Sequence, residues 1–94
     1  MVTLVIEHGL EDWAAWKAVF DEHAASRKEH GCIREELFRA EGGGSTIMNV
    51  MRWPDRATAD AFLADPSLAE AMGRAGVTGQ PRFTFWDSVE NNEF

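Results

Sequence analysis

Several side chains that can exchange protons or bind anions fall among apolar neighbours along the sequence. They are Glu7, His8, His23, Arg27, Asn49 and Asp87. A buried polar group must find a partner or costs a few kcal/mol, so each of these is either satisfied by the fold or available to a ligand.

His8 and His23 are the candidate catalytic bases. A histidine, whose ordinary pKa is about 6.5, is suited to take a proton from a phenol or an enol. The structural alternative for His8 is a hydrogen bond to the loop or helix start that follows it. For His23 the alternative is partial exposure or a bond to the sheet.

Asn49 and Arg27 are the candidate substrate-binding polar groups. Asn49 lies within an apolar segment, where an amide has few local partners and could hold a carbonyl or a developing oxyanion. Arg27 could bind a substrate carboxylate or enolate, or it could pair with Glu35 or Glu36 instead.

Four large aromatic side chains are candidates for the wall of a substrate cavity, although each could belong to the core. They are Trp16, Phe20, Trp53 and Trp86. We predict no metal and no cofactor, because the three histidines have unrelated spacings and Cys32 is alone. Cys32 is expected to fill space rather than to act as a nucleophile.

The longest predicted element is a helix from Asp12 to Gly31. At about 100° per residue, Trp13, Trp16, Phe20, Ala24 and Arg27 fall in one arc, with His23 at its edge. Asp12 is a favourable N-cap and Gly31 a favourable end.

Four strands are predicted from alternating apolar residues and β-branched content. They cover Thr3 to His8, Cys32 to Glu41, Thr46 to Trp53 and Arg82 to Glu90. The second carries charges on both faces and is expected at an edge, whereas the first and third are apolar on both faces and are expected at the centre. The turn 42–45 makes a hairpin of the second and third strands.

A second helical region is predicted between Pro54 and Gly76. Asp55 can cap its start, and Asp65 followed by Pro66 restarts the helix at an angle. The resulting order, β-α-β-β-α-β, predicts an α+β ferredoxin-like domain over residues 1–94, with both helices on one face of a four-stranded antiparallel sheet.

Strands that are apolar on both faces leave one face of this sheet uncovered when only two helical regions are present. A second copy related by a two-fold axis is the simplest cover, so we predict a homodimer that closes into an α/β barrel.

The formal charge of −7 comes without a basic cluster, which argues against nucleic acid and anionic membrane surfaces as partners. No apolar run approaches the roughly 20 residues of a membrane span, and no secretory leader is visible. The expected location is the cytoplasm.

A resemblance to a known superfamily is carried by motifs along most of the chain. They are His8, Asp12-x-x-x-Trp16-Lys17, Phe20-Asp21-x-His23, Arg27-x-x-x-Gly31, Ala59-x-x-Phe62-Leu63, Asp65-Pro66 and Met72-x-x-Ala75-Gly76-Val77. With these the chain resembles the dimeric α/β barrel superfamily, in particular small bacterial proteins described as antibiotic-biosynthesis-monooxygenase-like or as cyclases. The resemblance specifies the fold and leaves the chemistry open, because this fold supports many activities.

This chain departs from several motifs of the superfamily, and the residue roles that belong to those motifs cannot be transferred to it. Plant polyketide cyclases of this fold carry His-Pro-x-His where this chain has Asp65-Pro66-Ser67-Leu68, and the chain contains no tyrosine. The Asn, Trp and His set of haem-degrading relatives is not reproduced at matching positions.

Two functions follow as expectations. One is a cofactor-independent monooxygenase or cyclase that acts on an aromatic or polyketide-like molecule, with His8 or His23 removing a proton and Asn49 or Arg27 steadying the anion. The other is a non-catalytic homodimer that binds a hydrophobic ligand or serves a stress or regulatory role.

Overall fold

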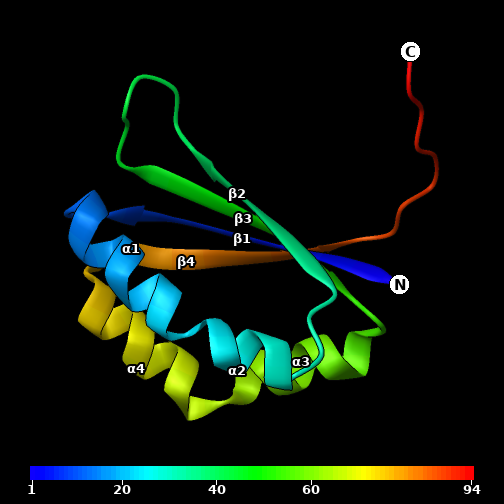
Figure 1. Ribbon diagram of the computed structural model, residues 1–94, viewed down its shortest axis with the longest axis horizontal. Helices are drawn as coiled ribbons and strands as arrows, with labels where there is room; N and C mark the ends of the chain where they lie inside the picture. Colours follow the sequence, from blue (N-terminus) through cyan, green and yellow to red (C-terminus); the bar gives the residue numbers. More distant parts are fainter.

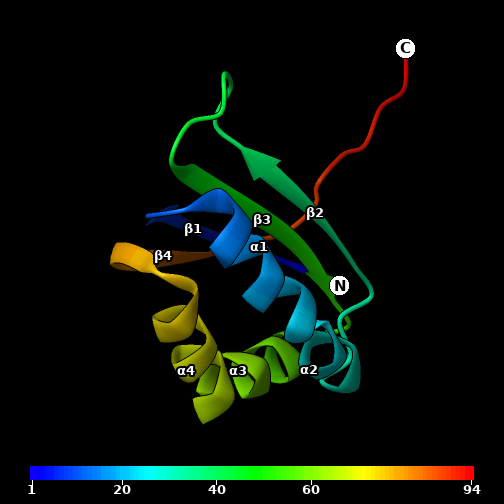
Figure 2. The ribbon, with the colours of Figure 1, turned by 60° about the vertical axis from the view of Figure 1, so that its left-hand side comes forward.

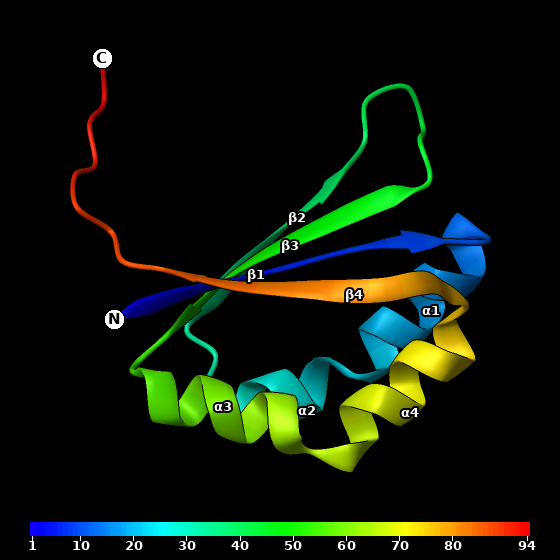
Figure 3. The same ribbon diagram turned by 180° about the vertical axis from the view of Figure 1, so that it is seen from behind.

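The computed structural model describes residues 1–94 and contains one antiparallel sheet with four helices (Figure 1). In chain order the elements are β1 (Val2–Leu10), α1 (Trp13–Glu22), α2 (Ala24–Glu29), β2 (Arg34–Arg39), β3 (Thr46–Trp53), α3 (Arg56–Ala64), α4 (Pro66–Ala75) and β4 (Val77–Trp86). The strands are arranged β2-β3-β1-β4, which confirms the predicted ferredoxin-like α+β fold. The helices all lie on one side of the sheet, as the view from behind also shows (Figure 3).

The positions of the strands follow from their charge. β2 is at one edge, as its charged residues predicted, and the two strands with apolar residues on both faces, β1 and β3, are paired at the centre. Along both central strands, buried positions alternate with partly exposed ones, because successive side chains point to opposite faces. The buried set faces the helices.

The predicted single helix from Asp12 to Gly31 is two helices, which Figure 2 shows meeting at an angle. The break is at His23, which has φ −84° and ψ 0°. In an unbroken helix the Phe20 carbonyl would accept from the amide four residues later. It accepts instead from the Arg27 guanidinium, Nη1 to O 3.0 Å, so a side-chain hydrogen bond replaces a helical one at the break.

The second helical region matches its capping signals. Asp55 accepts from the Thr58 amide at 2.8 Å, and Asp65 accepts from the Ser67 amide at 2.9 Å. The helix therefore stops at Ala64 and restarts at Pro66, as predicted.

The last strand was predicted from Arg82 to Glu90 but runs from Val77 to Trp86. Gly79 and Pro81 suggested a loop, yet they are accommodated because β4 is an edge strand whose pairing with β1 shifts register between Glu7 and Gly9. The residues after Trp86 form no helix or strand.

Two groups of buried side chains form the core on the helical face of the sheet. The larger contains Leu4, Ile6, Met51, Trp53, Ala59, Phe62 and Leu68, and the smaller contains Leu10, Trp16, Ile47 and Ala75. Three polar side chains are also buried on this face: His8, Arg27 and Asn49.

The opposite face of the sheet carries no helix (Figures 1 and 3). Paired positions across the strands bring apolar side chains together there, Val5 beside Val50 and Phe38 beside Met48. Phe38 is 41% exposed, and Trp86 on β4 is 59% exposed. None of the helices has the length and apolar character needed to cross a bilayer.

Phe62 packs α3 against the sheet. Its side chain is 1% exposed, and the centre of its ring lies 5.0 Å from the centre of the Trp53 ring. We expect Phe62→Ala to lower the free energy of unfolding by about 3–5 kcal/mol, measured by urea denaturation. Phe94→Ala is the matched control in the exposed C-terminal tail and should change it by less than about 0.5 kcal/mol. A similar small loss for both variants would contradict this packing.

Candidate functional site

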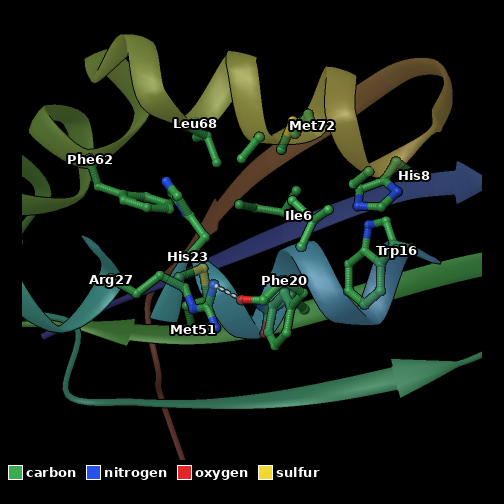
Figure 4. A pocket seen from close by; sticks show the side chains of 14 residues that line it. Ile6, His8, Trp16, Phe20, His23, Arg27, Met51, Phe62, Leu68 and Met72 are labelled. Atoms are coloured by element: carbon green, nitrogen blue, oxygen red, sulfur yellow. Dashed lines mark hydrogen bonds between the residues drawn. The ribbon is translucent and has the colours of Figure 1, made fainter. Parts of the chain in front are cut away.

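A cavity of about 60 Å³ lies between the two core groups, where α1, α2 and α4 stand off from β1 and β3 (Figure 4). Its polar lining residues are His8, His23, Arg27 and Asn49. Its apolar lining residues are Ile6, Trp16, Val19, Phe20, Met51, Phe62, Leu68, Ala71, Met72 and Ala75. The helices therefore do not close fully on the sheet, and they leave room beside the predicted polar residues.

His8 is 7% exposed and projects from β1 toward the helices. Its Nδ1 lies 2.9 Å from the Gly9 carbonyl oxygen. A carbonyl only accepts, so Nδ1 carries the proton and Nε2 has the lone pair in the neutral ring. Nε2 makes no hydrogen bond within the chain, and the ring lies 5.6 Å from Trp16. The bond therefore goes to the next residue of β1, not to the loop or helix start that was the structural alternative, and Nε2 is left without a partner.

His23 reaches the cavity from the break between α1 and α2. Its Nε2 lies 3.2 Å from the Ser67 hydroxyl on α4, and its Nδ1 has no hydrogen-bond partner in the chain. Asp65, two residues before Ser67, accepts a hydrogen bond from the Ser67 backbone amide. Because a hydroxyl both donates and accepts, the bond to Ser67 leaves either tautomer open to neutral His23.

Burial lowers the pKa of His23 below its ordinary value, and the nearby positive charge of Arg27 lowers it further. Both disfavour the imidazolium form. His23 is consequently neutral, and able to accept a proton, over a wider pH range than an exposed histidine.

Asp65 joins two helices next to His23. Its pKa is lowered, chiefly by the hydrogen bond from the Ser67 amide and next by the Ser67 side chain. His30 Nε2 lies 3.3 Å from its second oxygen. The group that holds Ser67 is thus an ionised carboxylate.

Arg27 is 5% exposed, and two of its guanidinium nitrogens hydrogen-bond within the fold. Its Nε donates to Glu35 at 3.0 Å, and its guanidinium carbon lies 3.8 Å from the centre of the Phe20 ring. Pairing with Glu35 is one of the two alternatives that the sequence left open for this residue. A buried charge is tolerated when it is paired and hydrogen-bonded in this way.

Asn49 is 7% exposed and projects from the middle of β3. Its Nδ2 donates to the second Glu35 oxygen at 3.0 Å, while its Oδ1 is buried without any partner. Because a carboxylate cannot donate, the neighbouring Glu35 determines which end of the amide is nitrogen.

The four predicted aromatic residues separate into two pairs. Trp16 and Phe20 line the cavity with their rings stacked 4.9 Å apart. Trp53 is fully buried in the core against Phe62, and its indole nitrogen has no hydrogen-bond partner. Trp86 is exposed on the edge strand β4. Trp53 and Trp86 therefore do not line the cavity, because one fills the core and the other lies outside it.

Two residues that contact the predicted site residues were not predicted as site residues from the sequence. Ser67 lies 44 positions from His23 and is brought to it only by the packing of α4 beside α1. Glu35 was considered solely as a partner for Arg27, yet it also holds Asn49. One sequence feature could have identified Glu35 as a site residue: it is an acidic residue on the inward side of an edge strand.

Cys32 is not an activated nucleophile. Burial, reinforced by the negative charge of Glu35, raises its pKa to about 11, and its thiol donates to backbone carbonyls. The thiol form is inert at neutral pH.

The fold is shared with several solved structures. SnoaB, described as a cofactor-independent oxygenase from Streptomyces nogalater, superposes with a TM-score of 0.80 at 22% identity, over 96% of this chain and 94% of that one. Rv0793 from Mycobacterium tuberculosis has a TM-score of 0.75 at 18% identity, over 98% of each chain. The monooxygenase ActVA-Orf6 of Streptomyces coelicolor, solved with nanaomycin D, has a TM-score of 0.69 at 17% identity, over 98% and 90% of the two chains. At these identities the likeness shows the fold.

Membership of a family comes from the sequence itself. A search of curated proteins finds no match. The model of the antibiotic biosynthesis monooxygenase family matches residues 4–74, which include every element from β1 to most of α4 and all four polar lining residues of the cavity. The chain belongs to the antibiotic biosynthesis monooxygenase family.

Proposed function

We propose that this protein is a cofactor-independent monooxygenase that acts on an aromatic or polyketide-like molecule by proton abstraction. The observation that carries the proposal is the state of His8 and His23. Both line one largely apolar cavity, and each has one ring nitrogen fixed by a hydrogen bond while the other is free. A histidine that is held in place through one ring nitrogen and has its other nitrogen unbonded is suited to act as a general base.

The reaction follows from these bases. His8 or His23 removes a proton from the substrate and leaves a carbanion. The carbanion passes electrons to O₂, so that a methylene becomes a ketone with release of water (R₂CH₂ + O₂ → R₂CO + H₂O). Trp16 and Phe20 contact the apolar rings of the substrate, and the Arg27 guanidinium lies in the same wall.

Two relatives support this proposal. SnoaB is described as a cofactor-independent oxygenase, and ActVA-Orf6 as a monooxygenase that was crystallised with a ligand. Transfer of either property to this chain rests on the shared family and fold together with the two histidines.

The size of the cavity bears equally on the alternative function, a non-catalytic homodimer that binds a hydrophobic ligand. The cavity of about 60 Å³ is smaller than the roughly 150 Å³ cavity that binds benzene in an engineered core. A ring system would enter only if side chains such as Met72 moved. Cyclisation through an enolate would need the same bases and the same movement.

We also infer that the functional unit is a homodimer closed through the uncovered sheet face. The apolar pairs Val5 with Val50 and Phe38 with Met48 lie on that face, where a two-fold copy would bury them.

The catalytic proposal is tested by oxygen consumption with a hydroxylated anthrone as substrate, without added flavin or metal, with the product identified by mass spectrometry. Loss of an essential general base costs about 10²–10⁴-fold in rate, so at least one of His8→Gln and His23→Gln should reach that range. His30→Gln is the control, because His30 does not line the cavity. Unchanged rates in both single variants and in the double variant would sink the assignment.

The pKa of His23 has a consequence for stability. Because the folded-state value lies below the unfolded value of about 6.5, the unfolded chain binds more protons in the window just below pH 6.5. The contribution of His23 is therefore complete above that pH and is lost as the pH falls. We expect NMR titration to give His23 a pKa below 6.5, and His23→Gln to flatten the fall of unfolding free energy with acidity. An ordinary titration with no change in pH dependence would contradict the burial of this ring.

The dimer is checked by light scattering coupled to size exclusion at micromolar concentration. The wild type should have twice the chain mass of 10.5 kDa. Val50→Glu should give the monomer, because a charge would be buried at the centre of the interface, whereas Ala61→Glu on the exposed side of α3 should leave the dimer intact. A monomeric wild type would overturn the dimer.

A further inference from the structure

We propose that a ligand enters the cavity through the seam between α1 and α4, and that the ion pair of Glu22 with Arg74 is a latch across this entrance. The inference rests on the proposed small-molecule function of the cavity and adds how the cavity is reached. The seam is formed by one face of each helix end: Val19, Glu22 and His23 on the α1 side, and Ser67, Ala71 and Arg74 on α4.

The cavity has to open before a ring can enter it, because its volume of about 60 Å³ is below the roughly 150 Å³ of a cavity that binds benzene. The floor of the cavity consists of side chains from β1 and β3, which are hydrogen-bonded to each other at the centre of the sheet. Separating these strands would break the sheet. The part of the wall that moves is therefore on the helical side.

Exposure identifies where the helical wall is thin. Among the lining side chains only Val19, Phe20, His23 and Met72 are partly exposed, and all the others are buried. A partly exposed lining side chain lies between the cavity and the solvent. These four residues therefore mark the possible entrances.

Two of these entrances are closed by packing. The Phe20 ring lies between the Trp16 ring, 4.9 Å away, and the Arg27 guanidinium, 3.8 Å away, so both of its faces are covered. Met72 packs against the larger core group and is turned by about 100° from Ala71, away from α1. The seam at Val19 and His23 is the remaining route.

Helical spacing places the seam residues on facing sides of α1 and α4. Ser67, Ala71 and Arg74 are four and three positions apart, so they share one face of α4, and the contacts of Ser67 and Arg74 turn that face toward α1. Val19 lies four positions before His23 on the corresponding face. Between the two polar contacts, the seam is thus closed by the side chains of Val19 and Ala71, as the close approach of α1 and α4 in Figure 4 allows.

The latch is the outer of the two polar contacts. Arg74 Nη1 donates to Glu22 at 3.2 Å, and the two side chains are 49% and 65% exposed. An ion pair in water is weak, so it can break and form again without unfolding the helices. The inner contact, from His23 to Ser67, lies beneath it at 3.2 Å.

The ends of α4 permit this movement. Asp65, with φ −68° and ψ 121°, separates α4 from α3, and Gly76, with φ 76° and ψ 38°, separates it from β4. Residues at the ends of elements absorb the backbone rotation when a lid opens. We therefore expect α4 to move away from α1 as one unit.

The latch is tested by the rates at which a probe enters and leaves. The probe is 1-naphthol, which is uncharged at pH 7 and changes its fluorescence when it leaves water, so stopped-flow mixing gives both rate constants. Glu22→Gln should raise the association and dissociation rate constants together, by about 1.5- to 5-fold. The dissociation constant should stay within about twofold, because the latch is present in the closed protein with and without the probe.

Glu70→Gln is the matched control for this variant. Glu70 accepts from Nε of the same guanidinium at 3.0 Å, but it lies on α4 itself and does not cross the seam. Both rate constants should equal those of the wild type. Raising NaCl from about 0.01 M to about 1 M should speed exchange in the wild type and not in Glu22→Gln, because salt screens the exposed pair.

A covalent lock tests the entrance itself. Glu22→Cys with Arg74→Cys, in a Cys32→Ser background and joined by a short bis-maleimide, should slow both rate constants about tenfold or more. The same protein with each thiol capped by N-ethylmaleimide is one control. The other is the pair Arg56→Cys with Asp60→Cys, which places the same linker within α3 and should exchange like the wild type.

The outcomes separate this inference from the function beneath it. Equal rate constants in Glu22→Gln and Glu70→Gln overturn the latch, and exchange in the locked protein as fast as in its capped control overturns the entrance at this seam. Either result leaves the small-molecule cavity in place, whereas failure of 1-naphthol to bind the wild type overturns the cavity function as well. If the cysteine variant fails to fold, the two glutamine variants and the salt dependence decide the question.

Discussion

A buried positive charge organises the helical side of this protein. The Arg27 guanidinium is almost completely removed from water, and each of its contacts belongs to a different element: the Phe20 carbonyl at the end of α1 and the Glu35 carboxylate on β2. Burying an unpaired charge is far more costly than any single contact here, so these elements must meet where the guanidinium can be satisfied. The break at His23, the inward Glu35 on the edge strand and the Asn49 amide all lie around this charge.

A cavity lies on the same side of the sheet, and Arg27 is one of its lining residues. His8 and His23 then enter the cavity from different layers, the sheet and the helix break. The nitrogens without a partner differ, Nε2 in His8 and Nδ1 in His23, because the other nitrogen of each ring bonds a different neighbour. Two histidines in largely apolar surroundings are compatible with proton abstraction from a weak acid.

The other face of the sheet is apolar and is covered by no helix. β1 and β3 are apolar on both sides, and four short helices cover only one of them. The apolar residues on the other side remain uncovered, as do the exposed Trp86 and the tail that follows it. The proposed second copy would bury them. The cavity and the uncovered face thus lie on opposite sides of two shared strands, and Asn49 and Val50 are consecutive residues that face them in turn.

The sequence by itself determined the order of the elements, the central and edge strands, the capped restart at Asp65 and the polar residues that would be buried among apolar ones. These features depend on short-range periodicity and on local capping chemistry, which neighbouring residues fully specify. It misjudged β4, because Gly79 and Pro81 are loop signals unless a strand is known to be at an edge, and it missed the break at His23, because a helical pattern continues through it. Only the tertiary structure decided that Ser67 meets His23, that Glu35 joins Arg27 to Asn49, and that Trp53 fills the core while Trp16 lines a cavity. These are contacts between elements distant in the chain, and the packing that forms them depends on the volume and charge of all their neighbours at once.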